Sequence, residues 1–356
     1  MKKIIIACDS YKGCLTSKEV NEAMACGVKN PTAGHDASEI ITLEMSDGGE
    51  GMLDAFLSAV EGERVLMPAH DALMRWIDAA YGIVTIKQGQ GFASFKEGDE
   101  VAIIEIAQTA GLALIEPEQR NPMKATSWGV GEMIMNAYRR GIRRFIVGLG
   151  GSATSDCGIG MLKAMGDDWK KIRQECRFVM ASDVTNPLCG QQGAAHVFAP
   201  QKGADSRMVE MLDKRAEKFA EVSAKHFGYD KSGTPGAGAA GGLGYAFLQY
   251  FDAEFQSGAE VLLQAVGFDE LLKDANLVIT GEGHSDRQTL MGKLPQRILE
   301  HAKAKKVWLV SGGISDEQML LAAGFDRLIA VTPKDMPLQE AMKAEKAKEN
   351  IMNALR

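Results

Sequence analysis

Short apolar runs alternate with stretches of helical periodicity near the start of the chain. An apolar run at 3–7 leads into a polar loop, and Thr16 or Ser17 can then cap an amphipathic helix. The same order recurs as an apolar run at 39–45, a polar loop and a helix at 52–60. Repeated strand–loop–helix units predict parallel strands whose following loops share the carboxyl edge of one sheet. Ligands bind along that edge in open α/β sheets.

The middle of the chain is expected to be richer in β-strands than the start. Three β segments with little helix between them are expected at 64–69, 76–87 and 101–107. Helical periodicity returns at 128–140. We infer an α/β protein in which one discontinuous domain, residues 1–62 and 270–356, is interrupted by an inserted domain of residues 63–269.

Further elements of both kinds are expected in the second half of the chain. Apolar runs predict strands at 178–183, 195–199, 277–280, 306–311 and 327–332. Periodic segments predict helices at 207–227, 295–304 and 338–355. Both ends of the chain therefore have the same strand–loop–helix character.

The stretch 145–156 has the form of an anion-binding turn. The stretch contains four apolar residues typical of a buried strand, three glycines and three hydroxyl residues, and a helix begins near Gly158. Glycines let backbone N–H groups approach a ligand, and the helix N-terminus adds partial positive charge. Phosphate or carboxylate would suit this place, although an ordinary βα turn explains the stretch equally well.

Composition favours a protein that acts on small molecules. The chain has 356 residues, enough for two domains, and a net charge of −7 with a pI near 5.5, so neither nucleic acid nor an anionic membrane is expected as a partner. No run approaches the length of a membrane span, and the first apolar run ends at Asp9, too early for an export signal. The six cysteines show no metal-binding spacing, so we expect reduced thiols in the cytoplasm. A homo-oligomer is compatible with the sequence.

Polar loops carry the candidate chemistry. They follow six of the expected strands, at 9–13, 46–50, 150–156, 183–186, 201–203 and 281–286, and we expect them to meet at one sheet edge. Together they supply carboxylates, the lysines Lys12 and Lys202, and glycine-rich backbone. Phosphoryl transfer from a nucleotide needs Mg²⁺ on carboxylates, cations on the migrating charge and a carboxylate for the acceptor proton. Each residue alone is equally well a helix cap or a surface charge, so the coincidence of six loops carries the argument.

Other nucleotide-binding motifs do not fit this sequence. A G-x-G-x-x-G pattern begins at Gly236, but a turn precedes it and not the strand of a dinucleotide-binding unit. Gly292-Lys293 lacks both the upstream glycine and the following Ser or Thr of a P-loop. The protein-kinase signatures are also absent from the sequence. A kinase of this sequence belongs to another class.

Ordered motifs over nearly the whole chain resemble the bacterial type I glycerate kinase family. They are Asp9-Ser10-Tyr11-Lys12-Gly13, 46–51, 119–122, 148–154, 182–188, 200–204, 235–244 and 279–283, with Asp286, Gln288, Thr289, Gly292 and Lys293. The resemblance implies a Rossmann-like parallel-sheet domain with a large inserted α/β domain, the glycerate kinase type I fold. It implies phosphorylation of D-glycerate by ATP with Mg²⁺ in the interdomain cleft, and 2-phosphoglycerate is favoured over 3-phosphoglycerate as the product.

On that resemblance we assign roles to individual residues as a hypothesis. The expected catalytic residues are Asp9, Lys12, Asp47, Asp183 and Lys202. The expected phosphate cradles are Gly150, Gly151 and Ser152, and Gly238, Gly241 and Gly242. The expected Mg²⁺ ligands are Asp183, Asn186, Glu282 and Asp286.

The chain departs from the family pattern in two places. The stretch 167–177 is shorter than is usual, which we interpret as a trimmed surface element. His284 and Ser285 stand where the family usually has Arg and Leu, and histidine would be a weaker, pH-dependent substitute for an arginine that contacts an anion. Two alternatives stay open, a non-catalytic sensor of sugar acids and an NAD-dependent sugar-acid oxidoreductase.

Overall fold

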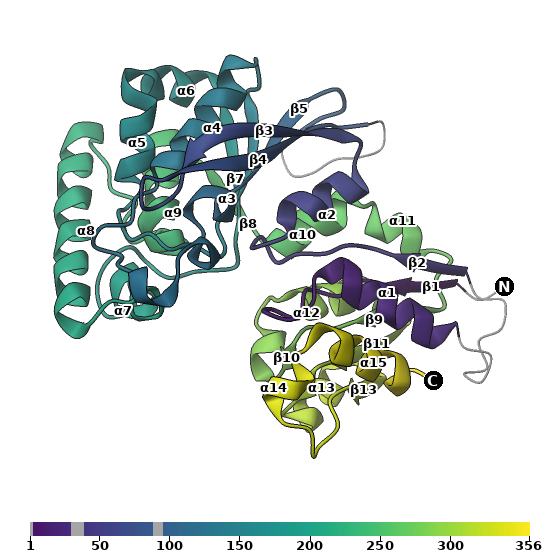
Figure 1. Cartoon of the computed structure of the whole chain (residues 1–356). Helices are drawn as coiled ribbons and strands as arrows, with labels where there is room; N and C mark the ends of the chain where they lie inside the picture. The colour runs from purple at the N-terminus through teal and green to yellow at the C-terminus, as the bar shows by residue number, and fades with distance from the viewer. Residues whose placement is uncertain (1–2, 30–38, 88–94) are drawn as a thin grey trace. The chain divides into compact units, whose positions relative to one another are not determined.

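The computed structural model describes residues 3–29, 39–87 and 95–356 and divides into two compact units (Figure 1). Within these residues, unit 1 comprises 3–29, 39–47, 54–59 and 259–356, and unit 2 comprises 48–53, 60–87 and 95–258. The chain changes units after residues 47, 53, 59 and 258. The domain boundaries expected from the sequence, after residues 62 and 269, stay a prediction.

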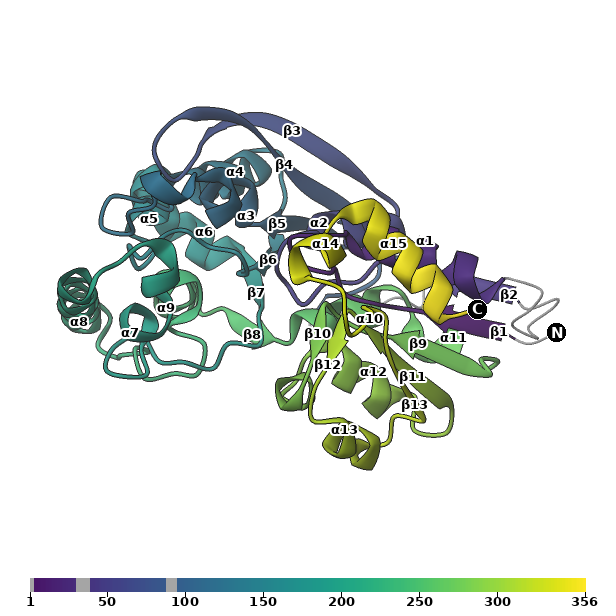
Figure 2. The ribbon, with the colours of Figure 1, turned by 60° about the horizontal axis from the view of Figure 1, so that its bottom comes forward.

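Unit 1 is built on a sheet of five parallel strands (Figure 2). Across the sheet they are β13 (Arg327–Ala330), β11 (Lys306–Ser311), β9 (Leu277–Thr280), β1 (Lys3–Ile6) and β2 (Glu39–Thr42). β1 and β9 are apolar and buried almost throughout, as strands of a parallel sheet covered on both faces must be. The strand order reverses between β1 and β9, so a ligand-binding crevice is expected beyond their carboxyl ends.

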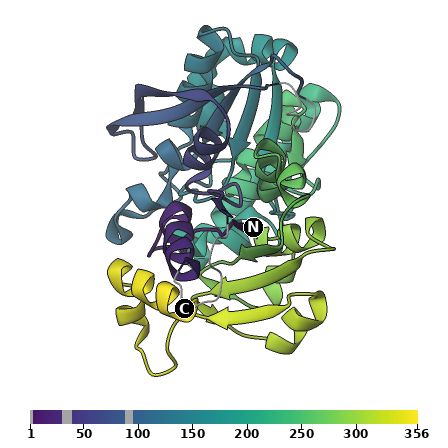
Figure 3. The same ribbon diagram turned by 90° about the vertical axis from the view of Figure 1, so that its right-hand side faces the viewer.

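Helices complete unit 1. They are α1 (Ser17–Val28), α2 (Met52–Ala59, shared with unit 2), α10 (Gly258–Ala265), α11 (Phe268–Leu272), α12 (Leu294–His301), α13 (Glu317–Ala323), α14 (Leu338–Ala341) and α15 (Ala344–Ala354). Helices α1 and α15, purple and yellow in Figure 3, pack into one apolar core with β1, β9 and β11. Thr16 caps α1 in a complete capping box with Glu19, which confirms the expected start of this helix.

Unit 2 contains a mixed sheet of six strands. In order they are β3 (Gly62–His70), β4 (Trp76–Thr85), β5 (Glu100–Glu105), β6 (Arg144–Gly148), β7 (Arg177–Ala181) and β8 (Glu254–Gln256). The first three pair antiparallel and the last four pair parallel. Its helices are α3 (Ala107–Ala110), α4 (Trp128–Arg139), α5 (Ile159–Met165), α6 (Trp169–Glu175), α7 (Ala194–Phe198), α8 (Ser206–Phe227) and α9 (Ala239–Phe251).

Short elements fill the connections. Two bridging strands, β10 (His284–Ser285) and β12 (Gly313–Ile314), pair in unit 1. Single 3₁₀ turns are η2 (Leu112–Leu114), η3 (Pro117–Gln119), η4 (Gly166–Asp168), η5 (Pro200–Lys202) and η6 (Arg287–Leu290). All six cysteines carry free thiols. None of the helices in the described ranges has the length and apolar character that a membrane crossing needs.

Three expectations from the sequence are wrong. The run 195–199 is not a strand but lies almost wholly in helix α7, because so short an apolar run has no periodicity that separates the two. The terminal segment 338–355 is two helices, α14 and α15, since the backbone of Lys343 is extended, a break that no glycine or proline marks. The six polar loops do not share one sheet edge, because β1, β2 and β9 belong to one sheet and β6 and β7 to another.

The contact between α1 and α15 yields a stability prediction. A Cβ atom on Gly27 would lie 2.9 Å from Leu355 Cβ and 3.0 Å from the Met352 carbonyl oxygen. Alanine normally stabilises a helix interior relative to glycine by about 0.5–1 kcal/mol, but overpacking costs about 1–3 kcal/mol. We therefore expect Gly27→Ala to lower the free energy of unfolding, measured by urea denaturation followed by circular dichroism.

The matched control for this prediction is Cys26→Ala. Cys26 is exposed in the same helix, so its substitution should change the free energy of unfolding by less than about 0.5 kcal/mol. A Gly27→Ala protein more stable than the wild type would show that α1 and α15 do not approach as closely as described.

Candidate functional site

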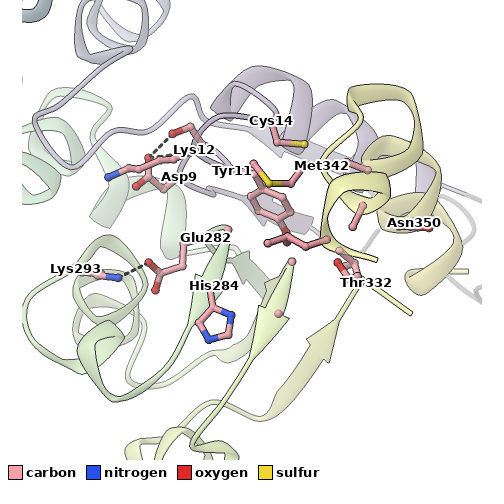
Figure 4. Close-up of a pocket in the computed structure, with 18 of the residues that line it drawn as sticks. Asp9, Tyr11, Lys12, Cys14, Glu282, His284, Lys293, Thr332, Met342 and Asn350 are labelled. Carbon is pink, nitrogen blue, oxygen red and sulfur yellow. Dashed lines mark hydrogen bonds and ion pairs between the residues drawn. The ribbon is translucent and has the colours of Figure 1, made fainter. Parts of the chain in front are cut away.

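A pocket of about 480 Å³ lies at the carboxyl edge of the sheet in unit 1 (Figure 4). Residues that follow all five strands line it. They include Asp9–Lys12 after β1, Asp47 after β2, Glu282–His284 after β9, Gly312 and Gly313 after β11, and Val331 and Thr332 after β13. The pocket therefore occupies the place that the strand order of unit 1 predicts for a ligand.

The loops after the two central strands are joined by their backbones. The Asp9 N–H donates to the Gly281 carbonyl oxygen at 3.0 Å, which extends the pairing of β1 with β9 into the pocket. Tyr11 then starts a tight turn in which its backbone pairs with Leu15, and Gly13 in this turn has a φ of +74°. The Tyr11 hydroxyl donates to the Val310 carbonyl oxygen at 3.1 Å and fixes the ring against β11.

Three predicted site residues after β1 and β2 lie together in this pocket. The exposed Lys12 Nζ lies 2.7 Å from Asp47 Oδ2, while Asp9 is buried and accepts a hydrogen bond of 2.7 Å from the Ser10 backbone. Burial and the nearby Asp47 carboxylate raise the pKa of Asp9 to about 7, against the opposing effect of Lys12. Desolvation lowers the pKa of Lys12, but Asp47 and Asp9 raise it by more, so the net shift is upward and Lys12 stays charged. A carboxyl group that titrates near neutral pH thus lies beside a permanent cation.

Glu282 is the carboxylate that the loop after β9 contributes. Its Oε2 lies 2.7 Å from Lys293 Nζ, and its Oε1 accepts a 2.6 Å hydrogen bond from Thr289 Oγ1. Lys293 and Thr289 are functional candidates that we did not assign from the sequence, although both stand in the motifs that carry the family resemblance. The failed comparison of Gly292-Lys293 with a P-loop was the available signal, because it drew attention to a lysine just before a helix.

Two other residues near Glu282 have local partners of their own. Asp286 caps η6, with its Oδ1 accepting from the Gln288 N–H at 2.7 Å, so it is engaged as a helix cap. His284, which we expected to stand in place of an arginine, is exposed and has Nε2 3.2 Å from Ser315 Oγ. His284 also lines the pocket.

Unit 2 holds a second cluster of predicted residues around Lys202. This lysine is only 2% exposed, and its Nζ donates to Ser152 Oγ at 2.8 Å and to the Thr154 carbonyl oxygen at 2.6 Å. Both of these partners are uncharged oxygens. Desolvation lowers the pKa of Lys202 to about 7, opposed by the more distant Asp156. Among the described residues, this buried amine is thus bonded to neutral oxygens, with Asp156 as the carboxylate that favours its charged form.

Two hydroxyl groups near Lys202, in the loop after β6, lack a hydrogen-bond partner among the described residues. Thr154 Oγ1 and Ser155 Oγ are buried without a hydrogen-bond partner among the residues that the structure describes. Buried polar atoms normally have partners, so an anion or water is the missing acceptor or donor in such a place. The loop after β6 thus brings hydroxyl groups close to the Lys202 amine, which comes from η5.

The predicted phosphate cradles lie against this cluster. Gly241, with a φ of +64°, packs so closely that a Cβ would lie 2.0 Å from the Thr154 carbonyl oxygen that Lys202 contacts. Two predicted cradle N–H groups are already bonded, however, from Gly150 to the Gly48 carbonyl and from Gly238 to the Asn186 carbonyl. These two glycines therefore shape the loops and do not offer free donors.

The remaining predicted residues complete unit 2. Gly151 has a φ of +72° in the turn after β6, and Gly242 has a φ of +89° beside Cys157. Asp183 is half-buried in the loop after β7, and Asn186 Nδ2 donates to the Gln192 carbonyl oxygen at 2.8 Å. The structure thus gathers Asp9, Lys12, Asp47 and Glu282 in the pocket of unit 1. Asp286 also belongs to unit 1, and all the other predicted site residues belong to unit 2.

The described residues do not form a metal site made of protein side chains alone. No group of three or more His, Cys, Asp or Glu side chains is arranged to hold a metal within residues 3–29, 39–87 and 95–356. Mg²⁺ is usually bound by one or two carboxylates together with substrate phosphates and water. Glu282, a predicted ligand that lines the pocket of unit 1, can supply a carboxylate oxygen in that mode of binding.

Comparison with known proteins identifies the relatives of this chain. The sequence profile of the Glycerate kinase family matches residues 4–173 and 167–356. These two matches meet at the stretch that we expected to be shorter than in the family. A glycerate kinase of Bacillus subtilis is 36% identical over 96% of this chain and 93% of its own length. A glycerate 2-kinase of Escherichia coli is 34% identical over 99% and 96%.

A solved structure is similar over the same length. It is the crystal structure of a candidate glycerate kinase 2 from Salmonella typhimurium LT2, with a TM-score of 0.79 and 34% identity. The similarity covers 100% of this chain and 96% of the other, which agrees with the expected fold class. The chain belongs to the glycerate kinase family and is a kinase.

Proposed function

We propose that the protein transfers the γ-phosphoryl group of ATP to D-glycerate and forms 2-phosphoglycerate. The observation that carries this proposal is the pocket of unit 1, where Asp9, Lys12 and Asp47 meet Glu282 and Lys293 at the switch point of a parallel sheet. Family membership supports glycerate as the acceptor, and the E. coli relative named glycerate 2-kinase supports the position of transfer. The enzyme is proposed to be cytoplasmic.

Asp9 is the proposed general base. A general base works best when its pKa lies near the operating pH, and burial brings the pKa of Asp9 to about 7. Its carboxylate would accept the proton of the glycerate hydroxyl as the oxygen attacks phosphorus. Asp47 holds Lys12 close by, so that the ammonium is oriented toward developing negative charge.

Mg²⁺ would be held by carboxylate oxygens together with the nucleotide phosphates, and when bound it neutralises phosphate charge. Of the predicted ligands, Glu282 is the one that we retain in the pocket of unit 1, while Asp183 and Asn186 belong to unit 2 and stay predictions. Asp286 is the weakest candidate because its Oδ1 already caps η6. Lys293 keeps the Glu282 carboxylate oriented through a 2.7 Å contact.

Lys202 is proposed to bind the carboxylate of glycerate. A buried cation that touches only a hydroxyl and a carbonyl oxygen gains most from an anionic partner. Ser152 and the unpaired Thr154 and Ser155 hydroxyls can donate to the same anion. The expectations that catalysis takes place in an interdomain cleft and that the protein forms a homo-oligomer stay predictions.

The first test is a direct assay. Purified protein with ATP, Mg²⁺ and D-glycerate should release ADP only when glycerate is present, and ³¹P NMR should identify 2-phosphoglycerate. The same protein with NAD should form no NADH. Glycerate binding without ADP release would favour the sensor, and NADH formation would favour the oxidoreductase.

The role of Asp9 predicts a pH dependence. Because the deprotonated carboxylate is the active form, kcat/KM should rise as pH increases and level off above about 7. Asp9→Asn should lower kcat by about 10²–10⁴ and remove that rise. Asp274→Asn, at an exposed position of unit 1, should leave the profile unchanged. An unaltered pH profile in Asp9→Asn would assign the base to another group.

The role of Lys202 predicts opposite effects on activity and stability. Its pKa is lowered in the folded state, so the unfolded chain binds the proton more tightly and stability rises with pH from about 7 toward the ordinary lysine range. Lys202→Met should remove this rise and stabilise the protein at neutral pH by about 1 kcal/mol or more. The same substitution should raise the KM for D-glycerate strongly.

Lys214→Met is the control for Lys202→Met. Lys214 is exposed on α8 in the same unit, so its loss should change neither the KM nor the dependence of stability on pH. A Lys202→Met enzyme with the wild-type KM for glycerate would show that the buried amine does not bind the acceptor.

A further inference from the structure

The pocket of unit 1 has two ends of different chemistry (Figure 4). Asp9, Lys12, Glu282 and Lys293 lie at one end, and Asp47 joins them through Lys12. The other end is lined by uncharged residues, among them Tyr11, Cys14, Met342 and Asn350, and Leu338 lines the pocket from α14, which directly precedes Met342. A ligand that fills the whole pocket must therefore be charged at one end and uncharged at the other.

The uncharged end presents apolar surface that the protein itself does not cover. Leu338 and Met342 on and after α14 are 73% and 42% exposed, although both line the pocket. The Tyr11 ring opposite is buried and held in place by its hydroxyl contact with Val310. Exposed apolar side chains that line a pocket beside a fixed ring mark a binding surface for an apolar or aromatic group.

Asn350 adds a polar group with unused hydrogen-bonding capacity. It projects from α15, is only 6% exposed and lines the same end of the pocket. Among the described residues its side chain has one partner, the Met336 sulfur at 3.4 Å from Nδ2, and a thioether is a weak acceptor. A buried amide normally makes stronger hydrogen bonds, so the ligand is the expected partner.

We infer that the uncharged end of this pocket binds the adenine base of the nucleotide and that Asn350 recognises its edge. This inference rests on the proposed function, because it assumes that ATP is the phosphoryl donor. Glycerate, a small polar anion, has no apolar part that could use this surface, whereas ATP joins an uncharged aromatic base to a charged triphosphate. An asparagine amide can donate to a ring nitrogen of adenine and accept from its amino group.

The inferred arrangement also places the triphosphate. With the base between Tyr11 and Met342, the phosphate tail runs toward Lys12 and Lys293 at the charged end of the same pocket. Cations at that end suit phosphate oxygens, and the carboxylates beside them suit the accompanying Mg²⁺. Base recognition and phosphate binding are thereby separate functions of one pocket.

Equilibrium binding tests the inference without turnover. We would measure the dissociation constants of ATP, ITP and inorganic triphosphate, each with Mg²⁺ and without glycerate, by titration calorimetry. Met342→Ala should weaken ATP binding about tenfold through lost apolar contact and leave triphosphate binding unchanged. Asn350→Leu should remove the preference for ATP over ITP, because ITP lacks the amino group that Asn350 would recognise.

Met319→Ala is the matched control. Met319 is 50% exposed on α13 of the same unit and does not line the pocket, so its loss should change none of the three constants. Leu338→Ala, at the exposed rim of the pocket, provides a further variant that does not disturb the core and should act as Met342→Ala does.

The outcomes separate this inference from the proposed function. Wild-type dissociation constants for ATP in Met342→Ala and Leu338→Ala, or equal losses for ATP and triphosphate, would overturn the base site even if the enzyme phosphorylates glycerate. A loss of glycerate binding in the same variants, with ATP binding unchanged, would also overturn it and assign the pocket to the acceptor. A wild-type protein that forms no phosphoglycerate from ATP would instead refute the proposed function.

Discussion

The backbone pairing between β1 and β9 is the constraint on which the candidate site depends. These strands are far apart in sequence, yet their register continues beyond the sheet in the hydrogen bond from the Asp9 N–H to the Gly281 carbonyl. Because the pairing is parallel, both following loops emerge at the same edge. The buried Asp9 and Glu282 carboxylates thus become neighbours, and their mutual repulsion contributes to the raised pKa of Asp9, after burial and Asp47.

The charged side chains of the two candidate clusters have different kinds of partner. In unit 1, lysines accompany the carboxylates, and the contacts of Lys12 with Asp47 and of Lys293 with Glu282 keep the cluster nearly balanced. In unit 2, Lys202 is buried with only a hydroxyl and a carbonyl oxygen as partners. A buried charge that is paired with an opposite charge is tolerated when no ligand is bound. A buried charge without such a partner lowers the free energy of unfolding until an anion binds beside it.

Much of the fold followed from the sequence because its signals were local. The apolar runs at 277–280 and 306–311 and the capped start of α1 needed only a few neighbouring residues to be recognised. The division of the loops between two sheets was not predicted, since strand pairing depends on contacts between distant segments. Helix α7 and the break at Lys343 were missed because short runs and unmarked breaks carry no periodic signal. Lys293 was overlooked as a site residue because only the folded chain places it against Glu282.

The discontinuity of unit 1 has a consequence for how the protein is made. β1 and β2 leave the ribosome early, but β9, β11 and β13 and the helices α14 and α15 that wall the pocket follow only after unit 2 has been synthesised. Until then the N-terminal strands lack the neighbour that β9 provides, and an unpaired apolar strand is prone to aggregation during synthesis. Ligand binding in this pocket therefore has to wait until β9, β11 and β13 and the helices α14 and α15 have been synthesised.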